Sequence, residues 1–362
     1  MNLKDVKRFS KQLGIDVFKV ERLTQDASNR KYFRIYSGFS GGDEESYIFC
    51  YLDPKIGSHE RFIKINKYLD PRIVPKILGF NLDQGITIQE DLGRKNLYSV
   101  WEENCDAWVS FSEFKNDFYK DVENCLDKIK QSVFPKSLVK RVSLGKLLSQ
   151  METFQDIFLK RLLKIDLFSG EMKDIKKLLD KLQKETIDRL SSQKWVNCHT
   201  DFEGRNIFYL GDYEPSIDFE VIDYQDICIG PEGIDLAGIY VDHYGGITMP
   251  SDGKRKFELI RWGGIQRNMR ILGTLSNLYL ENKRPFRLLD LPLIYQNLVN
   301  LVPDSNKYKK LKDFFTNEVP KKLLMRLSIV ERKKLGSLTD PIISNNISDE
   351  PSRLLQFLRA DT

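Results

Sequence analysis

The stretch "HTDFEGRNIF", from His199 to Phe208, decides the fold prediction because it places many polar side chains directly before an apolar run. The short apolar runs "NIFYL" (206–210) and "FEVID" (219–223) are separated by "GDYEPSID", which has the composition of a turn. This pattern predicts a β-hairpin, and a hairpin brings its two ends close together. We therefore expect Asp201 and Asn206, before the first strand, to converge with Asp223, at the end of the second.

These three oxygen-bearing side chains suit phosphoryl transfer. That reaction needs positioning, neutralisation of charge and a group that orients the attacking hydroxyl. Magnesium prefers carboxylate, amide and phosphate oxygens, so we expect Asn206 and Asp223 to bind Mg²⁺. Asp201 is expected to stay off the metal and to accept the proton of the substrate hydroxyl as the catalytic base.

The spacing indicates more than the residue types do. An Asp followed five positions later by Asn, and then a hairpin ending in apolar-apolar-Asp, is the arrangement of kinase-like enzymes. Any one of these residues alone is more often a polar cap in a turn. Asp235, in the following "GPEGIDLAGIYVDHY", is predicted to brace the loop through its N–H groups or through His199, so both residues are interpreted as structural.

The first ninety residues have a different pattern. "KYFRIYSGF" and "ESYIFCYLD" predict a hairpin, and "GSHERFIKINKYL" predicts a helix. "RIVPKILGF" and "QGITIQEDLG" predict two further strands. From Leu97 onward the pattern is mostly helical, most clearly in "EMKDIKKLLDKLQKETIDRL". The predicted fold class is α+β, with a small β-rich lobe at residues 1–92 and a larger, mostly helical lobe at residues 93–362.

Composition limits the classes of partner. The chain has 362 residues and a formal net charge of +5, an excess too small to indicate nucleic-acid binding. No stretch approaches the ~18 apolar residues of a membrane-spanning helix, and the N-terminal residues do not resemble a signal peptide. The five cysteines are scattered and form no CxxC pair, which favours reduced thiols and a cytoplasmic protein. The oligomeric state stays open.

"HTDFEGRN" and "VIDYQDICIGPEGIDLA" resemble the aminoglycoside phosphotransferase superfamily, which shares the protein-kinase-like fold. Within it, the chain is most similar to the bacterial anomeric kinases that act on N-acetylmuramate and N-acetylglucosamine in peptidoglycan recycling. "QDASNRKYFRI", "VPKILGFNLDQGITIQEDLG", "DYQDICIGP" and "GGIQRNMRILGTLSNL" carry this narrower resemblance.

The resemblance implies a bilobal fold that binds ATP and Mg²⁺ between its lobes. It implies transfer of the γ-phosphoryl group to the anomeric hydroxyl of the sugar, giving a sugar 1-phosphate. By matching positions, Asp201 becomes the base, and Asn206 and Asp223 become the magnesium ligands. The adenine is expected against the hinge that contains Gln89, Glu90 and Leu92. The loop that ends in Ser28 and Asn29 is expected to cover the phosphates.

One departure from the kinase pattern concerns the phosphates. A kinase strand usually carries a lysine for the α- and β-phosphates, and "YIFCYLD" has none. Arg30 and Arg34 lie on one face of their predicted strand, so either can supply the missing cation. The alternative is that both are surface arginines.

The sugar pocket needs polar contacts. Gln225 and Asp226 follow the predicted metal ligand closely, whereas Asp242, His243 and Arg267 are expected on its far side. An arginine at position 267 can meet a lactyl carboxylate through two parallel hydrogen bonds, or it can pair with Asp242. A further candidate is Arg205 of the catalytic loop, which either steadies the γ-phosphate or pairs with Asp226.

Two alternative functions remain at this point. A kinase of the same fold can act on another small hydroxyl acceptor, such as another sugar, an amino alcohol or an aminoglycoside. A nucleotide-binding regulator without catalysis is the other alternative, although the presence of all three candidate catalytic residues argues against it.

Overall fold

We analysed a computed structural model of the chain, which describes residues 1–23, 29–38, 45–97, 99, 111–210, 219–242, 246–250, 253–282 and 288–336. The chain divides into two compact units. Unit 1 comprises Met1–Ser143 and Ser192–Gly263, and unit 2 comprises Leu144–Ser191 and Gly264–Thr362. The predicted boundary at residue 92 separates a β-rich segment from a helical segment along the chain, whereas each of these units combines two stretches of chain. The predicted boundary stays a prediction.

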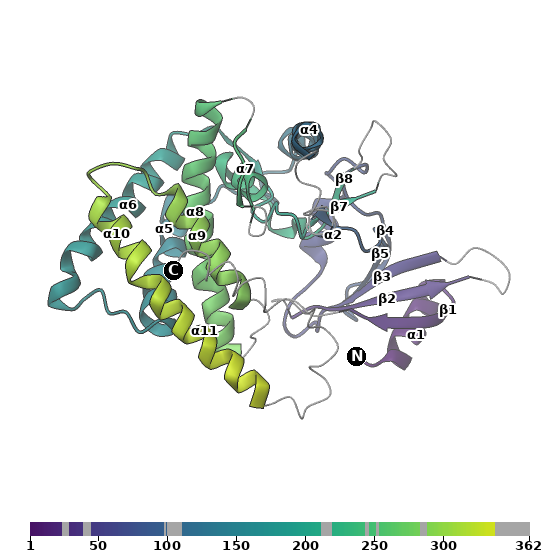
Figure 1. Cartoon of the computed structure of the whole chain (residues 1–362). Helices are drawn as coiled ribbons and strands as arrows, with labels where there is room; N and C mark the ends of the chain where they lie inside the picture. Colours follow the sequence, from purple (N-terminus) through teal and green to yellow (C-terminus); the bar gives the residue numbers. More distant parts are fainter. Residues whose placement is uncertain are drawn as a thin grey trace. The chain divides into compact units, whose positions relative to one another are not determined.

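Unit 1 begins with an antiparallel five-stranded sheet of order β1-β2-β3-β5-β4 (Figure 1). The strands are β1 (Val17–Arg22), β2 (Lys31–Ser37), β3 (Glu45–Tyr51), β4 (Ile77–Asn81) and β5 (Ile86–Glu90), and helix α2 (Glu60–Asn66) lies between β3 and β4 in the chain. The predicted order of strand, strand, helix, strand, strand is therefore confirmed. Strand β1 and helix α1 (Leu3–Gln12) were not predicted.

Helix α1 has a local sequence signal. The side chain of Asn2 accepts a hydrogen bond from the Asp5 N–H at 2.9 Å, and the Asp5 carboxylate accepts one from the Asn2 N–H at 3.1 Å. This reciprocal pair is a capping box, which satisfies two backbone donors at the start of a helix. The capping box starts a helix whose Val6 packs in the sheet core.

The two faces of the sheet differ. One face packs into a core with α1 that contains Val17, Phe33, Ile35, Phe49, Ile86 and Ile88. Because side chains alternate along a strand, the opposite face carries Arg34 of β2, Cys50 of β3 and Thr87 of β5. Arg34 is therefore buried on the face of the sheet that points away from α1.

The rest of unit 1 holds the predicted catalytic region. Strands β7 (Ile207–Tyr209) and β8 (Phe219–Val221) pair as an antiparallel hairpin, which confirms that prediction. The pair β6 (Trp195–Cys198) and β9 (Cys228–Pro231) was not predicted, nor was the two-residue pair β10 (Val241–Asp242) and β11 (Gly246–Ile247). Around them lie α4 (Phe111–Gln131), the 3₁₀ turn η4 (Tyr224–Asp226), α7 (Gly233–Tyr240) and the first part of α8 (Lys254–Asn282).

Unit 2 is helical in the part that the structure describes. It contains α5 (Leu144–Thr153), a π-helical segment η2 (Phe154–Leu162), the 3₁₀ turn η3 (Gly170–Met172), α6 (Lys173–Ser191) and the rest of α8. It also contains η5 (Leu288–Asp290), α9 (Leu291–Leu301), α10 (Lys309–Asn317) and α11 (Val319–Gly336). The amphipathic helix predicted from Glu171 to Leu190 is confirmed as α6, which buries Ile175, Leu179, Leu182 and Leu190. Among the described helices, none combines the length and the apolar character needed to cross a bilayer.

Candidate active site

The loop between β6 and β7 is held from behind by a buried carboxylate. The side chain of Asp235, on α7, is 1% exposed and accepts hydrogen bonds from the backbone N–H groups of His199 at 2.6 Å and Thr200 at 2.8 Å. Thr200 has a φ of 76°, in the left-handed region that non-glycine residues seldom adopt. Asp235 therefore fixes the loop where its backbone is strained.

The imidazole of His199 joins this loop to the second strand of the hairpin. The side chain is fully buried, and its Nε2 donates to the carbonyl of Ile222 at 3.0 Å. Ile222 directly precedes Asp223, so His199 connects the catalytic loop to the residue before the second candidate metal ligand. This contact is the arrangement expected of a structural histidine.

The structure brings together Asp201, Asn206 and Asp223. The side-chain amide of Asn206 donates from Nδ2 to the Asp201 carbonyl at 2.9 Å. The carbonyl of Asn206 accepts the N–H of Ile222, also at 2.9 Å, which places the start of β7 beside the end of β8. Asp223 is close enough to Asp201 for the two carboxylates to repel each other. The convergence expected from the hairpin is therefore present.

These residues fit a divalent cation as a partial set of ligands. Because Nδ2 of Asn206 is used by the Asp201 carbonyl, the amide oxygen is left as the group for another partner, and oxygen is what Mg²⁺ binds. Within the described residues, no three His, Cys, Asp or Glu side chains are grouped as a metal site. Two protein ligands suit an ion that takes its other ligands from water and nucleotide phosphates, as Mg²⁺ does in kinase sites.

The environment of Asp223 opposes its ionisation. Burial raises the pKa of its carboxyl, and the charge of Asp201 raises it further. A hydrogen bond of 2.7 Å from Gln225 lowers it, as do the neighbouring His199 and Arg30. A cation bound at this position would favour the ionised form, because an opposite charge nearby stabilises a carboxylate.

Arg30 is the predicted phosphate cation that lies beside this carboxylate. Its Nη1 is 3.4 Å from Oδ1 of Asp223, and its side chain is 16% exposed. It also interacts with Tyr32 and with Cys50 of β3. Burial raises the pKa of the Cys50 thiol to about 12, so the thiol is neutral. Strand β3 has no lysine, and the positive charge beside Cys50 comes from Arg30, which directly precedes β2.

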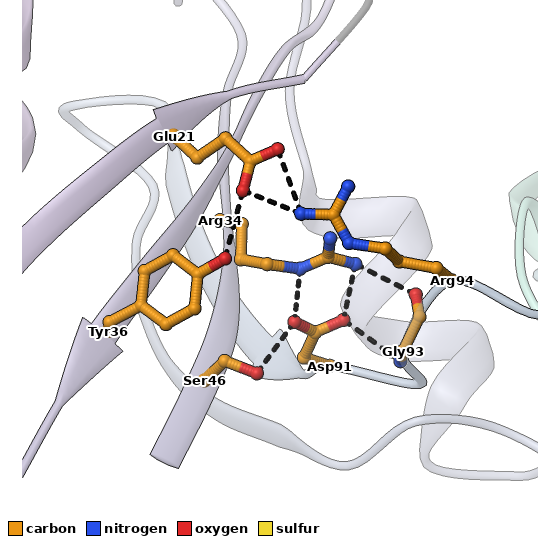
Figure 2. Close-up of polar contacts among 7 residues, drawn as sticks. All are labelled: Glu21, Arg34, Tyr36, Ser46, Asp91, Gly93 and Arg94. Atoms are coloured by element: carbon orange, nitrogen blue, oxygen red, sulfur yellow. Dashed lines mark hydrogen bonds and ion pairs between the residues drawn. The ribbon is translucent and has the colours of Figure 1, made fainter. Parts of the chain in front are cut away.

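Arg34 has another environment (Figure 2). Its Nε and Nη2 bind the two carboxylate oxygens of Asp91 at 2.5 and 3.0 Å, and Nη2 also donates to the Gly93 carbonyl at 2.7 Å. Ser46 of β3 donates to the same carboxylate at 2.8 Å. The Arg34 and Asp91 side chains are 8% and 2% exposed. The guanidinium is thus committed to the segment after β5, and we do not retain Arg34 as a phosphate ligand.

The predicted hinge residues Gln89 and Glu90 are at the end of β5. Gln89 pairs with Ile48 of β3 on one side and with Ile77 of β4 on the other. The Glu90 carboxylate accepts a hydrogen bond from the N–H of Lys76 at 2.8 Å, which links the end of β5 to the start of β4. Leu92 lies between Asp91 and Gly93, the two residues that Arg34 holds. Adenine binding at this segment stays a prediction.

Comparison with known proteins finds relatives in sequence and in fold. No family model matches the chain. An N-acetylmuramate/N-acetylglucosamine kinase from Pseudomonas aeruginosa is 24% identical over 314 residues, which cover 77% of this chain and 82% of the relative. A kinase of the same name from Neisseria meningitidis serogroup B is 22% identical over 278 residues, covering 71% and 78%.

Two solved structures are similar in fold. An ethanolamine kinase from Plasmodium vivax superposes with a TM-score of 0.52 at 14% identity, covering 84% of this chain and 90% of its own. An aminoglycoside 2'-phosphotransferase-IIIa, solved with GDP, gives 0.51 at 11% identity, covering 82% and 98%. The fold is that of the aminoglycoside phosphotransferases. The predicted fold class and resemblance are thereby confirmed, and so is the prediction that the chain is a small-molecule phosphotransferase.

The sugar-site residues predicted for this phosphotransferase are only partly described. Gln225 donates from its amide to Asp223 at 2.7 Å and to Asp226 at 3.5 Å, so these two polar side chains do adjoin the predicted metal ligand. Arg205 lies in the catalytic loop, and its carbonyl accepts a hydrogen bond from Asn96 at 3.5 Å. Arg267 is 1% exposed, on the part of α8 that belongs to unit 2.

Several other predicted site residues lie at or beside positions that the structure does not describe. Ser28 and His243 are outside the described residues, as is the side chain of Asp242. Asn29 is described and exposed, directly before Arg30. The assignments of these residues to the nucleotide and to the sugar stay predictions.

The sequence prediction overlooked residues of α2 that contact the turn after Asp223. Arg61 donates to backbone carbonyls there, and Phe62 stacks on Tyr224. The helical spacing that predicts α2 marks only its apolar positions, so an arginine among other charged residues gives no signal of such a role.

Proposed function

We propose that this protein is an ATP- and Mg²⁺-dependent kinase of N-acetylated amino sugars. It transfers the γ-phosphoryl group to the anomeric hydroxyl of N-acetylmuramate or N-acetylglucosamine, giving a sugar 1-phosphate for cell-wall recycling in the cytoplasm. The observation that carries the proposal is the convergence of Asp201, Asn206 and Asp223 at one end of the β7–β8 hairpin. The names of the two sequence relatives support the choice of sugar.

Each residue has a separate part in the reaction. Asp201 accepts the proton of the anomeric hydroxyl as the sugar oxygen forms its bond to the γ-phosphorus. The bond from that phosphorus to the β-γ bridging oxygen breaks, and ADP leaves. Asn206 and Asp223 would hold Mg²⁺, which when bound would neutralise charge on the phosphate oxygens.

Arg30 supplies the cation that the strand lysine provides in other kinases. Its position 3.4 Å from Asp223 supports this role, because the phosphates of a magnesium-bound nucleotide must lie near the metal ligands. A guanidinium binds phosphate oxygens through two parallel hydrogen bonds, which fixes orientation as well as charge. Ser28 and Asn29 precede it in the chain and are proposed to cover the phosphates.

The sugar is proposed to be recognised by polar side chains. Gln225 and Asp226 lie next to the proposed metal ligand, and Arg205 lies in the catalytic loop. Asp242 and His243 are further candidates for contacts to the sugar. A site built on hydrogen bonds to substrate groups discriminates strongly against analogues that lack them.

The test is a screen of acceptors with ATP and with GTP. N-acetylmuramate and N-acetylglucosamine are compared with other hexoses, an amino alcohol and an aminoglycoside, and phosphorus NMR identifies the oxygen that is modified. We expect a phosphomonoester whose phosphorus couples to the anomeric proton. The methyl glycoside of N-acetylglucosamine, which has no free anomeric hydroxyl, is the matched control and should not react.

Each other outcome of the screen contradicts part of the proposal. A product phosphorylated at another oxygen, or phosphorylation of the methyl glycoside, would overturn the anomeric assignment. Turnover only with the amino alcohol or the aminoglycoside would overturn the sugar assignment. Nucleotide binding without turnover of any acceptor would indicate a regulator.

A further inference from the structure

Helix α2 is joined to the turn that follows Asp223. Arg61 donates from Nε to the Gln225 carbonyl at 2.7 Å and from Nη2 to the Ile227 carbonyl at 3.0 Å. Its Nη1 donates to the carbonyl of Leu138. One guanidinium therefore binds two carbonyls of the segment after Asp223 and one carbonyl of the segment that follows α4.

Two further side chains of α2 contact the same turn. The rings of Phe62 and Tyr224 stack with centroids 4.8 Å apart and planes inclined by 12°. The amide of Asn66 donates to the hydroxyl of Tyr224 at 2.7 Å. Tyr224 is fully buried, so its ring is held on α2 by packing and by a hydrogen bond together. We call Arg61, Phe62 and Asn66 the α2 latch.

The residue that the latch adjoins has a strained backbone. Asp223 has φ 64° and ψ 31°, the left-handed conformation. A side chain with a Cβ pays about 1 kcal/mol or more for this conformation, which persists where the surrounding structure enforces it. On its N-terminal side, Ile222 is held by hydrogen bonds with His199 and Asn206. On its C-terminal side, the latch holds the next residues.

An arginine is suited to this task. Its planar guanidinium has several N–H groups in a fixed fork, so it can bind carbonyls of two chain segments at once, which the single ammonium of lysine cannot reproduce. Protein kinases couple a helix of the N-terminal lobe to the nucleotide through a Glu–Lys ion pair. Strand β3 of this chain has no lysine, and here the helix is coupled to the backbone of the aspartate turn instead.

We propose that Arg61 is a positioning residue for Asp223, and that the α2 latch sets the aspartate in the orientation that binds Mg²⁺. The inference rests on the proposed function, since it requires Asp223 to be a magnesium ligand. Arg61 acts through the backbone of residues 225 and 227, whose carbonyls accept its hydrogen bonds. Groups that orient metal ligands commonly change metal affinity or activity by about 10- to 100-fold when they are replaced.

The experiment measures nucleotide affinity by calorimetry, with Mg²⁺ and with EDTA, in the full-length protein. For Arg61→Gln we expect the gain in ADP affinity produced by Mg²⁺ to shrink by about 10-fold, with binding in EDTA unchanged. Arg61→Lys keeps the charge but not the fork, so we expect a partial loss in a variant that still folds. The matched control is Lys64→Gln, since Lys64 is on the same helix and pairs with Glu60 at its exposed surface.

Several results would overturn the inference. They are an unchanged magnesium effect in both Arg61 variants, an equal loss of affinity in EDTA and in Mg²⁺, or the same loss in Lys64→Gln. Asp223→Asn in the same assay separates the two proposals. If it too leaves the magnesium effect unchanged, the proposed function fails. If it abolishes the effect while the Arg61 variants retain it, only the positioning role fails.

Discussion

Two buried carboxylates of unit 1 hold two segments of the chain in different ways. Asp235 binds the backbone N–H groups of His199 and Thr200 directly, behind the catalytic loop. Asp91 follows β5 and is bound by the side chains of Arg34 and Ser46, with one bond from a backbone N–H, that of Gly93. The catalytic loop is therefore fixed by backbone amides, whereas the predicted hinge is fixed mainly by an ion pair (Figure 2).

This difference determines how much stability is lost when each carboxylate is replaced. A carboxylate bound by backbone amides loses hydrogen bonds when it is replaced, and the neutral amides stay behind. A buried ion pair that loses one partner leaves a charge without compensation, which costs more. The two segments therefore differ in the expected cost of a single substitution and in whether a second substitution can restore stability.

The largest expected effect is that of Asp91→Ala. Removing this carboxylate leaves the buried Arg34 guanidinium unpaired, and we expect the free energy of unfolding to fall by about 3–5 kcal/mol. Urea denaturation measures the change. The double variant Arg34→Met/Asp91→Leu should lose less than Asp91→Ala, because an apolar pair needs no compensating charge. A loss in the double variant equal to the sum of the losses in Arg34→Met alone and Asp91→Leu alone would refute an ion-pair anchor.

The next effect is that of Asp235→Asn. The asparagine amide keeps one acceptor oxygen, but its NH₂ group faces a backbone N–H. We therefore expect the free energy of unfolding to fall by about 2 kcal/mol. We also expect kcat to fall while nucleotide affinity is retained, because the loop carries Asp201, the proposed base. Steady-state kinetics and calorimetry check this, with Glu232→Gln beside α7 as the control. Unchanged kcat in a destabilised variant would show that Asp235 supports the fold only.

A third prediction concerns His59, a buried neutral side chain that holds the Gly85 carbonyl before β5. Its Nε2 lies 3.2 Å from the Gly85 carbonyl, and burial together with the charge of Arg30 lowers its pKa from 6.5 to about 4. Between these values the unfolded chain binds more protons than the folded one. The stabilisation is therefore complete above about pH 6.5 and is lost as the pH falls toward 4, by about 3 kcal/mol for a shift of this size.

The variant His59→Gln tests this pH dependence. Glutamine keeps a donor for the Gly85 carbonyl but does not titrate, so its unfolding free energy should fall less between pH 7 and pH 4.5 than that of the wild type. Thermal or urea unfolding at several pH values gives both curves. Parallel curves would mean that His59 is protonated in the folded protein as readily as in the unfolded one.

The smallest effect is expected for the exposed ion pair between Arg94 and Glu21. Arg94 binds Glu21 at 2.8 Å, but the Arg94 side chain is 68% exposed, and exposed ion pairs contribute little. Arg94→Gln should therefore leave the urea midpoint nearly unchanged at moderate salt. A loss similar to that of Asp91→Ala would mean that the Arg94–Glu21 pair and the Arg34–Asp91 pair, both drawn in Figure 2, stabilise the fold as one unit.

The same comparison shows what the sequence can predict. The β7–β8 hairpin and its three convergent side chains follow from residues that lie close together in the chain. The partner of Arg34 does not, because Asp91 is 57 positions away and strand register decides whether the two meet. Arg34 therefore resembled a phosphate ligand in the sequence although its guanidinium is bound to Asp91.

Short elements were missed for another physical reason. The four-residue strands β6 and β9 are too brief for a period of two to show, and β9 contains glycine and proline. Strand β1 alternates poorly, since Val17 is its only buried residue. Pairing with distant segments stabilises these strands, and a single sequence does not contain that information.

The central claim is that Asp201 and Asp223 form one centre with separate roles, and a paired measurement tests it most directly. Turnover of ATP with N-acetylglucosamine and ADP affinity with Mg²⁺ are measured for Asp201→Asn and Asp223→Asn. We expect Asp201→Asn to bind Mg²⁺ and ADP as the wild type does while its turnover falls ~100- to ~10,000-fold, and Asp223→Asn to lose the magnesium-dependent affinity. Near-normal turnover in Asp201→Asn, or unchanged magnesium-dependent binding in Asp223→Asn, would contradict the account.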